Sequence, residues 1–429
     1  MLDIRFIRER PEIVKEDLRK RGDLEKIPWV DDLLSYDAEW RRLITELNSL
    51  RERRNIVTEE IARFKREGKA FSDKMREARE IPGRVRRLEE EAGAYEEKVR
   101  SILLRLPNIM HETVPLGRDE NDNEEIRRCG EIPKLNFKPK DHIELSLDLD
   151  LVDLNRAAKV AGARFYYLKN ELVLLNYALI KYALDFLENK GFTLFQPPYS
   201  IRREAISGAT ALSDFEDMIY KIEGENLYLI ATSEHALVAL HMDEILDGKT
   251  LPLRYCGVSP CFRKEAGAHG RDTKGIFRTH QFEKVEQFTF CKPEDSWKEH
   301  ERLIANAEEY FRNLKIPYRV VNVCSGDLGT VAAKKYDLEA WLPGQKKYRE
   351  VVSCSNCTTY QAVRSRIRYR EKPNEPTAYV HTLNSTLVAT ERALIAILEN
   401  YQQEDSSVIV PKVLVPYMSG LERITRSKN

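Results

Sequence analysis

The chain has 429 residues, and its 70 basic and 70 acidic side chains cancel to a formal charge of zero. This length is enough for two or three domains, and the neutral balance excludes a global field that would attract an anionic partner. Seven scattered cysteines argue against a disulfide framework, the charged N-terminus is unlike a signal peptide, and no apolar stretch is long enough for a membrane span. We therefore expect a soluble, cytoplasmic protein with no membrane partner.

Two segments near the N-terminus carry a heptad pattern. Apolar or aromatic residues recur at alternating steps of three and four from Leu33 to Phe64 and again from Val85 to Leu106. Between them, Gly68 and the pair Ser72-Asp73 are typical of a turn followed by a helix start. Such a heptad pattern places the apolar residues in one stripe, a heptad seam, along which long helices pack against each other. The sequence predicts an antiparallel helical hairpin whose first helix runs from residue 31 to residue 67.

The predicted hairpin is locally basic. Between Arg41 and Arg87 there are 15 basic and eight acidic side chains, a net charge of +7 within a neutral chain. One interpretation is a solvated coiled coil whose surface is rich in arginine. The other is a basic finger that follows a phosphate backbone and releases its counterions. The charge pattern alone leaves both open.

The remainder of the chain changes character after Leu106. Prolines and glycines punctuate a polar stretch, and helical periodicity returns at Asp150 to Leu187, followed by strand-like segments without a regular βαβ rhythm. This mixture favours an α+β fold, with domains at residues 1–110 and 166–429 joined by a linker at 111–165. No glycine-rich phosphate loop is present, so any nucleotide would be held by side chains.

One charged segment stands out within the second domain. If Arg278 to Glu286 forms a strand, period two places Phe282, Lys284 and Glu286 on one face together with Arg278 and His280. Burying unpaired charges is costly, so this is either a catalytic face or a solvated edge. A second charged strand end, at 261–265, precedes it. The glycine-rich and basic loop at 266–275 between them would suit a lid over a polyphosphate.

These segments resemble motif 2 of class II aminoacyl-tRNA synthetases, and specifically that of the seryl-tRNA synthetase family. Four further stretches agree with the family in order and spacing: Leu106 to Gly117, Thr232 to Glu234, Tyr348 to Cys357 and His381 to Arg392. The likeness runs from Met1 to about Tyr401. It implies an N-terminal antiparallel coiled-coil arm and a class II catalytic domain built on an antiparallel β-sheet flanked by helices.

The resemblance implies that one group of residues binds ATP as a substrate. Arg263 would grip the α-phosphate, Glu265 would hold the adenine amino group, and Phe282 would stack on the ring. Arg278 and Arg392 would clamp the outer phosphates, and Arg263, Glu265 and Arg392 are expected to be the catalytic residues. With their neighbours, the residues expected to bind ATP are Arg263, Lys264, Glu265, Arg278, Thr279, His280, Gln281, Phe282, Glu350, Val351, Val352, Ser353 and Arg392.

A second group is implied to bind L-serine. Glu234 and Glu286 would hold the serine ammonium, so that its carboxylate attacks the α-phosphorus without a general base, and Thr386 would meet the serine hydroxyl. A site that bonds a hydroxyl discriminates against alanine, because its polar groups are then left unpaired. The residues expected to bind serine are Thr232, Ser233, Glu234, Arg263, Glu286, Asn384 and Thr386.

The resemblance also implies a metal ion and shows one departure. Glu350 and Ser353 would share a Mg²⁺ that bridges ATP phosphates, since hard oxygen ligands suit this cation. The stretch from His381 to Arg392 resembles motif 3 of the family. Within it, Ser385 and the pair Thr390-Glu391 occupy positions that are often small or glycine in the family. His235 is interpreted as a helix-face residue without a role.

The partners follow from the same resemblance. The segment Tyr177 to Pro198 resembles motif 1 and implies a homodimer. In this family the hairpin reaches the long variable arm of tRNA(Ser), which favours the basic-finger interpretation, and tRNA(Sec) is expected as a further substrate. The residues expected to bind tRNA are Arg41, Arg51, Arg54, Arg63, Lys65, Arg66, Lys74, Arg76 and Arg79.

Two other functions remain open at this point. One is a synthetase-like enzyme that activates serine but loads a different acceptor; relatives of that kind lack the arm that this chain has. The other is a non-enzymatic coiled-coil protein that binds RNA or serves as a scaffold. Intact Arg263, Glu286, Glu350 and Arg392 argue against the second alternative.

Overall fold

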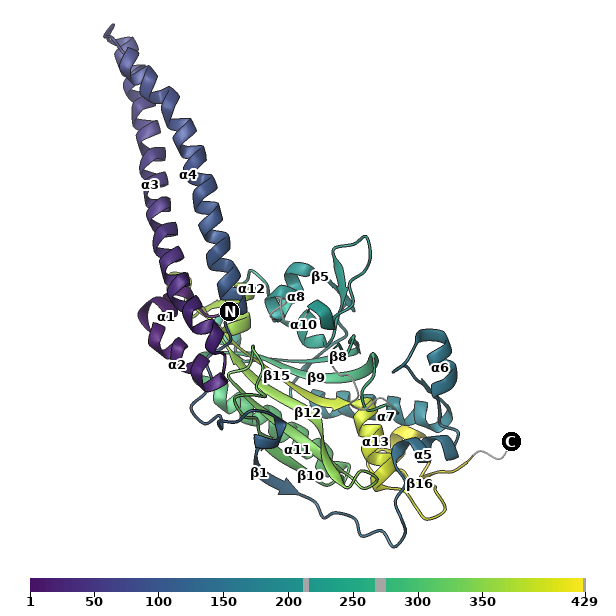
Figure 1. The fold of residues 1–429 in the computed structure, drawn as a ribbon. Coiled ribbons are helices and arrows are strands. Elements are labelled where there is room, and N and C mark those ends of the chain that lie inside the picture. Colours follow the sequence, from purple (N-terminus) through teal and green to yellow (C-terminus); the bar gives the residue numbers. More distant parts are fainter. Residues whose placement is uncertain (211–215, 267–274, 427–429) are drawn as a thin grey trace. The chain divides into compact units, whose positions relative to one another are not determined.

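The computed structural model describes residues 1–210, 216–266 and 275–426. The chain forms two compact units, Leu2–Leu106 and Pro107–Asn429, the second of which also includes Met1. Both are drawn in Figure 1. Within the described residues, no helix combines the length and the apolar character that a membrane span requires.

The first unit is helical and contains the predicted hairpin (Figure 1). Its elements are α1 (Ile4–Glu9), α2 (Pro11–Arg21), the short 3₁₀ turn Leu24–Lys26, α3 (Ile27–Arg66) and α4 (Ser72–Arg105). The long helix α3 begins four residues earlier than predicted. Pro28 lies in its first turn, where a missing N–H costs no hydrogen bond and the fixed φ angle suits a helix.

The two long helices pack through the predicted heptad seam. Leu47, Leu50 and Val57 of α3 form one buried cluster with Ile81 and Val85 of α4. Ion pairs cross the seam on the surface, from Arg53 to Glu77 at 2.6 Å, from Lys74 to Glu60 at 2.7 Å and from Arg51 to Glu89 at 2.7 Å. Exposed pairs add little stability, but these three favour this register of the two helices over others.

The second unit is built on an eight-stranded sheet, which confirms the predicted α+β class. All neighbouring strands are antiparallel except β4 and β8, which are parallel. The expected linker contributes the edge strand β1. In sheet order the strands are β1 (Glu124–Cys129), β10 (Tyr318–Asn322), β11 (Lys334–Leu342), β12 (Lys347–Thr358), β15 (His381–Ala389), β9 (Gln281–Cys291), β8 (Leu253–Phe262) and β4 (Thr193–Phe195).

Helices and short strands surround this sheet. The described helices are α5 (His142–Asp148), α6 (Leu154–Ala161), α7 (Asn170–Asn189), α8 (Arg203–Ala209), α10 (Ser233–Ala239), α11 (Ser296–Asn313), α12 (Tyr360–Ser365) and α13 (Thr390–Asn400). The short strands are β2 (Val152–Asp153), β3 (Tyr167–Leu168), β5 (Ser200–Arg202), β6 (Leu227–Leu229), β7 (Ile245–Asp247), β13 (Arg368–Arg370), β14 (Ala378–Tyr379), β16 (Val408–Ile409) and β17 (Arg423–Ile424).

The main hydrophobic core lies between the sheet and α7, α11 and α13. Leu179, Tyr310 and Leu394 from these three helices are buried in one cluster with Leu338 of β11 and Leu383 of β15. Apolar burial on this scale is the dominant stabilising term of a domain. It covers one face of the central strands, so the residues between the core positions point to the other face.

We predict that the hairpin depends on Val57, which is fully buried in its seam. Replacing Val57 with Ala should lower the free energy of unfolding by about 2 kcal/mol, because two methyl groups are lost and a cavity remains. The neighbouring Ile56 on the same helix is 40% exposed and provides the matched control. Chemical unfolding followed by circular dichroism measures both; equal effects of Ile56→Ala and Val57→Ala would contradict the prediction.

Candidate active site

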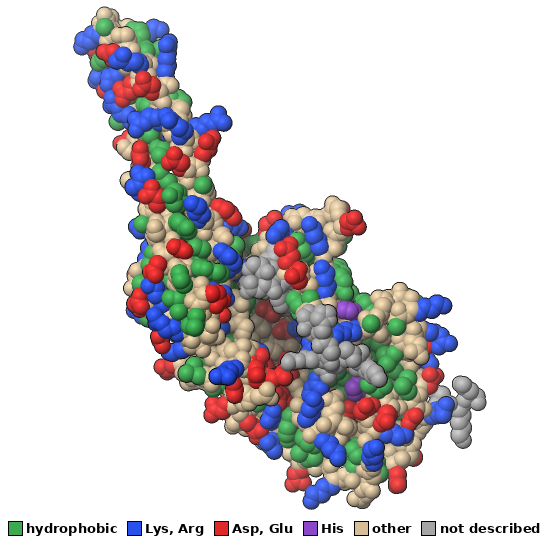
Figure 2. All heavy atoms as spheres, viewed as in Figure 1, with side chains coloured by type: hydrophobic (Ala, Val, Ile, Leu, Met, Phe, Trp, Pro, Cys, Tyr) green, Lys and Arg blue, Asp and Glu red, His purple; other side chains and the backbone are tan. Residues whose placement is uncertain are grey.

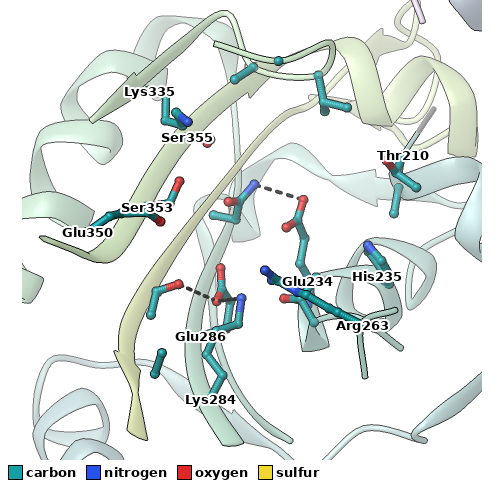
Figure 3. Close-up of a pocket in the computed structure, with 18 of the residues that line it drawn as sticks. Thr210, Glu234, His235, Arg263, Lys284, Glu286, Lys335, Glu350, Ser353 and Ser355 are labelled. Carbon is teal, nitrogen blue, oxygen red and sulfur yellow. Dashed lines mark hydrogen bonds and ion pairs between the residues drawn. The ribbon is translucent and has the colours of Figure 1, made fainter. Parts of the chain in front are cut away.

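The second unit contains a cavity of about 520 Å³ on the face of the sheet opposite the main core (Figure 3). Its walls come from β9, β11, β12, β15, α10, the end of α8, the start of α13, Arg263 directly after β8, and the segment 328–332. The residues that line it are Ala209, Thr210, Thr232, Glu234, His235, Arg263, Phe282, Lys284, Glu286, Leu328, Gly329, Thr330, Val331, Ala332, Lys335, Glu350, Val351, Ser353, Ser355, Cys357, Asn384, Thr386, Ala389, Glu391 and Arg392.

Strand β9 supplies the floor of this cavity. Phe282, Lys284 and Glu286 point into it, which confirms that these three residues share one face. Gln287 points the other way and donates to the carbonyl of Leu303 on α11. The predicted strand was too long, however, since β9 begins at Gln281. Arg278, Thr279 and His280 precede it, and the Thr279 hydroxyl donates to the Gln281 carbonyl, so these residues form a turn instead of a strand.

The end of β8 and the start of β9 form the platform expected for adenine and the α-phosphate. The Arg263 guanidinium lies 5.0 Å from the centre of the Phe282 ring, and its Nε donates to the carbonyl of Ala231. Arg278 donates to Glu265 at 2.9 Å, and His280 Nδ1 lies 2.8 Å from the Arg263 carbonyl. These interactions hold the platform residues together before any ligand binds.

Some of the residues expected to bind ATP lie beside the cavity and do not line it. They are Lys264, Glu265, Arg278, Thr279, His280, Gln281 and Val352. Val352 belongs to the main core, because successive residues of β12 point to opposite faces. Of the predicted lid, residues 267–274 lie outside the described residues.

The other end of the cavity holds two carboxylates, the half-buried Glu234 and the buried Glu286. Gln361 and Asn384 donate to the same oxygen of Glu234, Oε1, at 2.7 and 3.1 Å, which leaves Oε2 for a ligand. Glu286 is 1% exposed and lies 2.5 Å from the ammonium of Lys284. Figure 3 shows both carboxylates directed toward the middle of the pocket.

The charge of this end depends on pH. Burial, followed by repulsion from Glu286, raises the pKa of Glu234 to about 7, although Lys284 opposes the shift. Burial also lowers the pKa of His235 to about 3, so this lining residue is neutral. A ligand ammonium between the two carboxylates would favour the charged form of Glu234.

Of three further residues expected to bind serine, two complete this end and one lies behind it. The Thr386 hydroxyl donates to Glu286 Oε2 at 3.3 Å, and Thr232 lines the cavity at the N-cap of α10. Ser233 differs: it is fully buried and donates to the carbonyl of Gly257, so it positions α10 against β8 and lies outside the lining.

The residues expected at the phosphates lie on β12 and α13. Arg392 donates to the Glu350 carbonyl at 3.0 Å and pairs with its carboxylate at 3.3 Å. Burial tends to raise the pKa of Glu350, but Arg392, Lys335 and Arg263 outweigh it and hold the pKa below its usual value. Glu350 and Ser353 both line the cavity from β12 (Figure 3), so a charged carboxylate and a hydroxyl face the same space.

Four lining or supporting residues were not assigned roles from the sequence. Gln361 fixes Glu234, and its own carbonyl accepts from Thr382 at 2.7 Å. His235 lies on α10, as interpreted from the sequence, and it also lines the cavity. Glu391 is 3% exposed, and burial raises its pKa to about 7. The period-two alternation of the predicted strand had placed Lys284 on the same face as Phe282 and Glu286. No local pattern distinguishes Gln361 from other polar residues at a helix start.

Two family models match the chain. The seryl-tRNA synthetase N-terminal domain matches residues 1–110, and the tRNA synthetase class II core domain (G, H, P, S and T) matches residues 218–401. The serine–tRNA ligase of Pyrococcus horikoshii is 55% identical over 99% of this chain and 97% of its own length. That of Nitrosopumilus maritimus is 51% identical over 99% of this chain and its full length.

Solved structures agree with these matches. The crystal structure of seryl-tRNA synthetase from Pyrococcus horikoshii complexed with ATP has 54% identity and a TM-score of 0.93, with 100% of each chain covered. A cytoplasmic serine–tRNA ligase from Naegleria fowleri in complex with AMP has 38% identity and a TM-score of 0.87, covering 100% of this chain and 99% of that one. The chain, with its class II sheet, its helical hairpin and its cavity of paired carboxylates and arginines, belongs to the seryl-tRNA synthetase family.

Proposed function

We propose that the chain is a serine–tRNA ligase that joins L-serine to ATP as seryl-adenylate and then transfers the seryl group to the 3′ end of tRNA(Ser). One observation carries this proposal. A single cavity holds the carboxylate pair Glu234 and Glu286 at one end and the Arg263–Phe282 platform beside Arg392 at the other. An ammonium-binding site next to a nucleotide and phosphate site is what activation of an amino acid requires.

Serine binding would use the carboxylate end. The serine ammonium would lie against Oε2 of Glu234 and the carboxylate of Glu286, where charge-assisted hydrogen bonds are strongest. The Thr386 hydroxyl, which donates to Glu286, is placed to exchange that bond for one with the serine hydroxyl. Alanine would leave this hydroxyl without its partner, and threonine would need room for one more methyl group.

Adenylate formation would then proceed by in-line attack. A serine carboxylate oxygen forms a bond to the α-phosphorus while the bond from that phosphorus to the pyrophosphate oxygen breaks. Pyrophosphate leaves with the electron pair of the broken bond, so the negative charge that the carboxylate loses appears on the leaving group. Arg263 would stabilise the transferring phosphoryl group and Arg392 the outgoing phosphates. No residue needs to remove a proton, because the attacking carboxylate is already ionised at neutral pH.

The residues at the phosphates fit a hard divalent cation such as Mg²⁺. Glu350 is held in its charged form, and Ser353 adds a neutral oxygen on the same strand. Mg²⁺ is usually bound by one or two protein oxygens together with phosphates and water, so two protein ligands are sufficient. When bound there, the ion would neutralise charge on the phosphates.

The second step transfers the seryl group to RNA. The terminal ribose hydroxyl forms an ester bond to the seryl carbonyl carbon, the bond from that carbon to the AMP phosphate oxygen breaks, and the hydroxyl proton is released. We propose that the hairpin holds the tRNA, and that tRNA(Sec) is accepted in the same way. In the described part of the chain, five of the expected tRNA-binding cations form no ion pair with an acidic side chain: Arg54, Arg63, Lys65, Arg66 and Arg79.

The distribution of charge supports this role for the hairpin. Figure 2 shows Lys and Arg side chains gathered toward the end of the hairpin where α3 ends and α4 begins. The other expected cations are paired: Arg41 with Asp37, Arg51 with Glu89, Lys74 with Glu60 and Arg76 with Asp73. Unpaired surface cations can bind phosphates without first losing a partner.

A homodimer through the motif 1 region is part of the proposal. Leu174 and Tyr177 on α7 are 54% and 61% exposed, and Leu194 on β4 is 39% exposed. Large apolar side chains exposed together along one segment are typical of a protein interface. The strand β4 also forms an edge of the eight-stranded sheet, and an edge strand can pair with another chain.

The first prediction tests the activity itself. Serine should support exchange of pyrophosphate into ATP, while alanine and threonine should support it at least about 100-fold less. Alanine leaves the group that binds the serine hydroxyl without a partner, and threonine needs room for one more methyl group. A panel of amino acids in an ATP–pyrophosphate exchange assay measures this. No exchange with serine, or equal exchange with alanine, would overturn the proposed function and favour a scaffold.

The second prediction concerns Glu234, whose pKa is raised to about 7. Serine should bind the charged form, so its affinity should fall as the pH drops from 8 to 6, approaching about tenfold per pH unit below 7. Calorimetric titration with serine at several pH values measures this. Glu234→Gln, which cannot ionise, should bind serine more weakly and without this pH dependence; a parallel pH dependence in the variant would rule Glu234 out as its source.

The third prediction concerns the hairpin. Replacing Arg63 and Arg66 with Ala should weaken tRNA(Ser) binding by about tenfold, because two phosphate contacts are lost. The slope of the logarithm of the binding constant against the logarithm of the salt concentration should become shallower by about one for each cation removed. Exchange with serine should not change. Arg42→Ala is the matched control, since Arg42 already pairs with Glu39 and Glu46 on the same helix. Equal effects in all variants would mean that the hairpin does not bind RNA through these cations.

A further inference from the structure

Phe277 lies close to the phosphate end of the cavity but is not among the described residues that line it. The residue directly precedes Arg278, its side chain is 5% exposed, and it belongs to the main hydrophobic core. A buried ring behind the lining can influence a bound nucleotide only through the side chains that it contacts.

Two arginines share the Phe277 ring. The guanidinium carbon of Arg349 lies 3.8 Å from the centre of the ring, and that of Arg392 lies 5.0 Å from it. Both distances are within the range at which a cation is attracted to the face of an aromatic ring. An aliphatic side chain of similar size would fill the same space in the core, but it would not attract the two guanidinium groups.

Few other groups fix the direction of the Arg392 side chain. Its Nη1 donates to the Glu350 carbonyl at 3.0 Å and lies 3.3 Å from the Glu350 carboxylate. Its Nε is buried and has no hydrogen-bond partner within the described residues. A bound cation would compete for the carboxylate, because Glu350 is also the expected Mg²⁺ ligand. The Glu350 carbonyl and the Phe277 ring would then be the contacts that keep Arg392 in place.

The backbone on both sides of Phe277 is itself held. On one side, Arg278 donates to Glu265 at 2.9 Å. On the other side, Gly275 has a φ angle of +77°, and a Cβ atom there would come within 2.4 Å of His142 Nε2. Only a glycine permits such a close approach, so this backbone lies directly against the start of α5. The position of the ring is therefore fixed before any ligand binds.

Helix α13 is tied to the same region at both of its ends. Arg392 lies in its first turn and contacts the Phe277 ring. Near its last turn, the buried Glu399 accepts from the backbone N–H of His142 at 3.1 Å and lies 3.1 Å from the Nδ1 atom of that residue. A charged group that must be held to a fraction of an ångström depends on supporting contacts of this kind.

From these contacts we propose that Phe277 is a positioning residue, whose ring holds the Arg392 guanidinium toward the outer phosphates of ATP. The inference rests on the proposed function, in which Arg392 binds those phosphates. The alternative is that Phe277 only fills space in the core. The observations favour positioning, because two guanidinium groups lie over one ring and the Nε of Arg392 has no hydrogen-bond partner in the described part of the chain.

Binding of ATP and of AMP to the full chain separates the two ideas. Phe277→Leu should weaken ATP binding by about tenfold, as for loss of a buried cation–π contact, and should leave AMP binding within about twofold, because AMP has no outer phosphates. Phe277→Tyr, which retains a ring, should keep ATP binding within about threefold. Calorimetric titration without serine measures both ligands. A disturbed core would instead weaken ATP and AMP binding alike.

Phe192→Leu is the matched control. Phe192 is 4% exposed in the same core cluster, and no cation lies over its ring in the described structure. Loss of this ring should therefore leave the ratio of ATP affinity to AMP affinity unchanged. Phe277→Met, with a flexible apolar side chain that adapts to the shape of a core, repeats the test in case Phe277→Leu does not fold.

A double-mutant cycle shows whether the ring acts through Arg392. In a chain that carries Arg392→Ala, Phe277→Leu should cause no further loss of ATP affinity, because the group that the ring positions is absent. In serine-dependent ATP–pyrophosphate exchange, Phe277→Leu alone should raise the KM for ATP by about tenfold and leave the KM for serine unchanged.

Three results would overturn the inference and leave the proposed function intact. They are equal weakening of ATP and AMP binding by Phe277→Leu, an ATP affinity that this change does not alter, and a full further loss when it is added to Arg392→Ala. Absence of serine-dependent exchange in the unmodified protein would overturn the proposed function, and the inference with it.

Discussion

The constraint on which the cavity depends is a pair of carboxylates at one end of it, the buried Glu286 and the half-buried Glu234. Repulsion from Glu286 makes the ionisation of Glu234 more costly. The surroundings offset this cost with Lys284 on β9 and with the amides of Gln361 and Asn384. Under the proposed function, the serine ammonium would add a positive charge beside both carboxylates and so favour their charged forms.

The antiparallel sheet is what brings these groups together. Glu286 is paired with Thr386 of β15 and with Gly257 of β8, so one register places a carboxylate, a hydroxyl and a residue without a side chain next to each other. A Cβ atom at Gly257 would come within 2.7 Å of the Ser233 side chain, and its absence lets α10 approach closely enough to deliver Glu234. Glu286 and Thr386, which are 100 positions apart in the sequence, thus meet through backbone pairing.

Much of this arrangement follows from local sequence patterns. The heptad seam predicted the hairpin to within a few residues of each helix end, and period two correctly placed Phe282, Lys284 and Glu286 on one face. These patterns did not predict that β9 begins only at Gln281. The hydrogen bond from the Thr279 hydroxyl to the Gln281 carbonyl lies just before the strand, and the alternation of residue types carries no information about it.

Longer-range features were out of reach for a different reason. Gln361 and the lining segment 328–332 acquire their positions only when β12, β15 and the segment around Asn108 come together. These contacts join residues that are far apart in the sequence, so no local spacing of residues predicts them. The roles of Arg263 and Glu350 came instead from resemblance to a family, and the cavity shows that these residues share one space.

The alternation along β9 has a further consequence for how this chain can vary in length. Glu286 points into the cavity while the adjacent Gln287 is fixed to α11 on the other face, where it also accepts from Asn306. Inserting or deleting a single residue within Gln281–Cys291 would exchange the two faces, turning an amide toward the substrate and a carboxylate into the core. A change of length within this strand is therefore costly, and the strand fixes the spacing from Phe282 to Glu286 within the cavity.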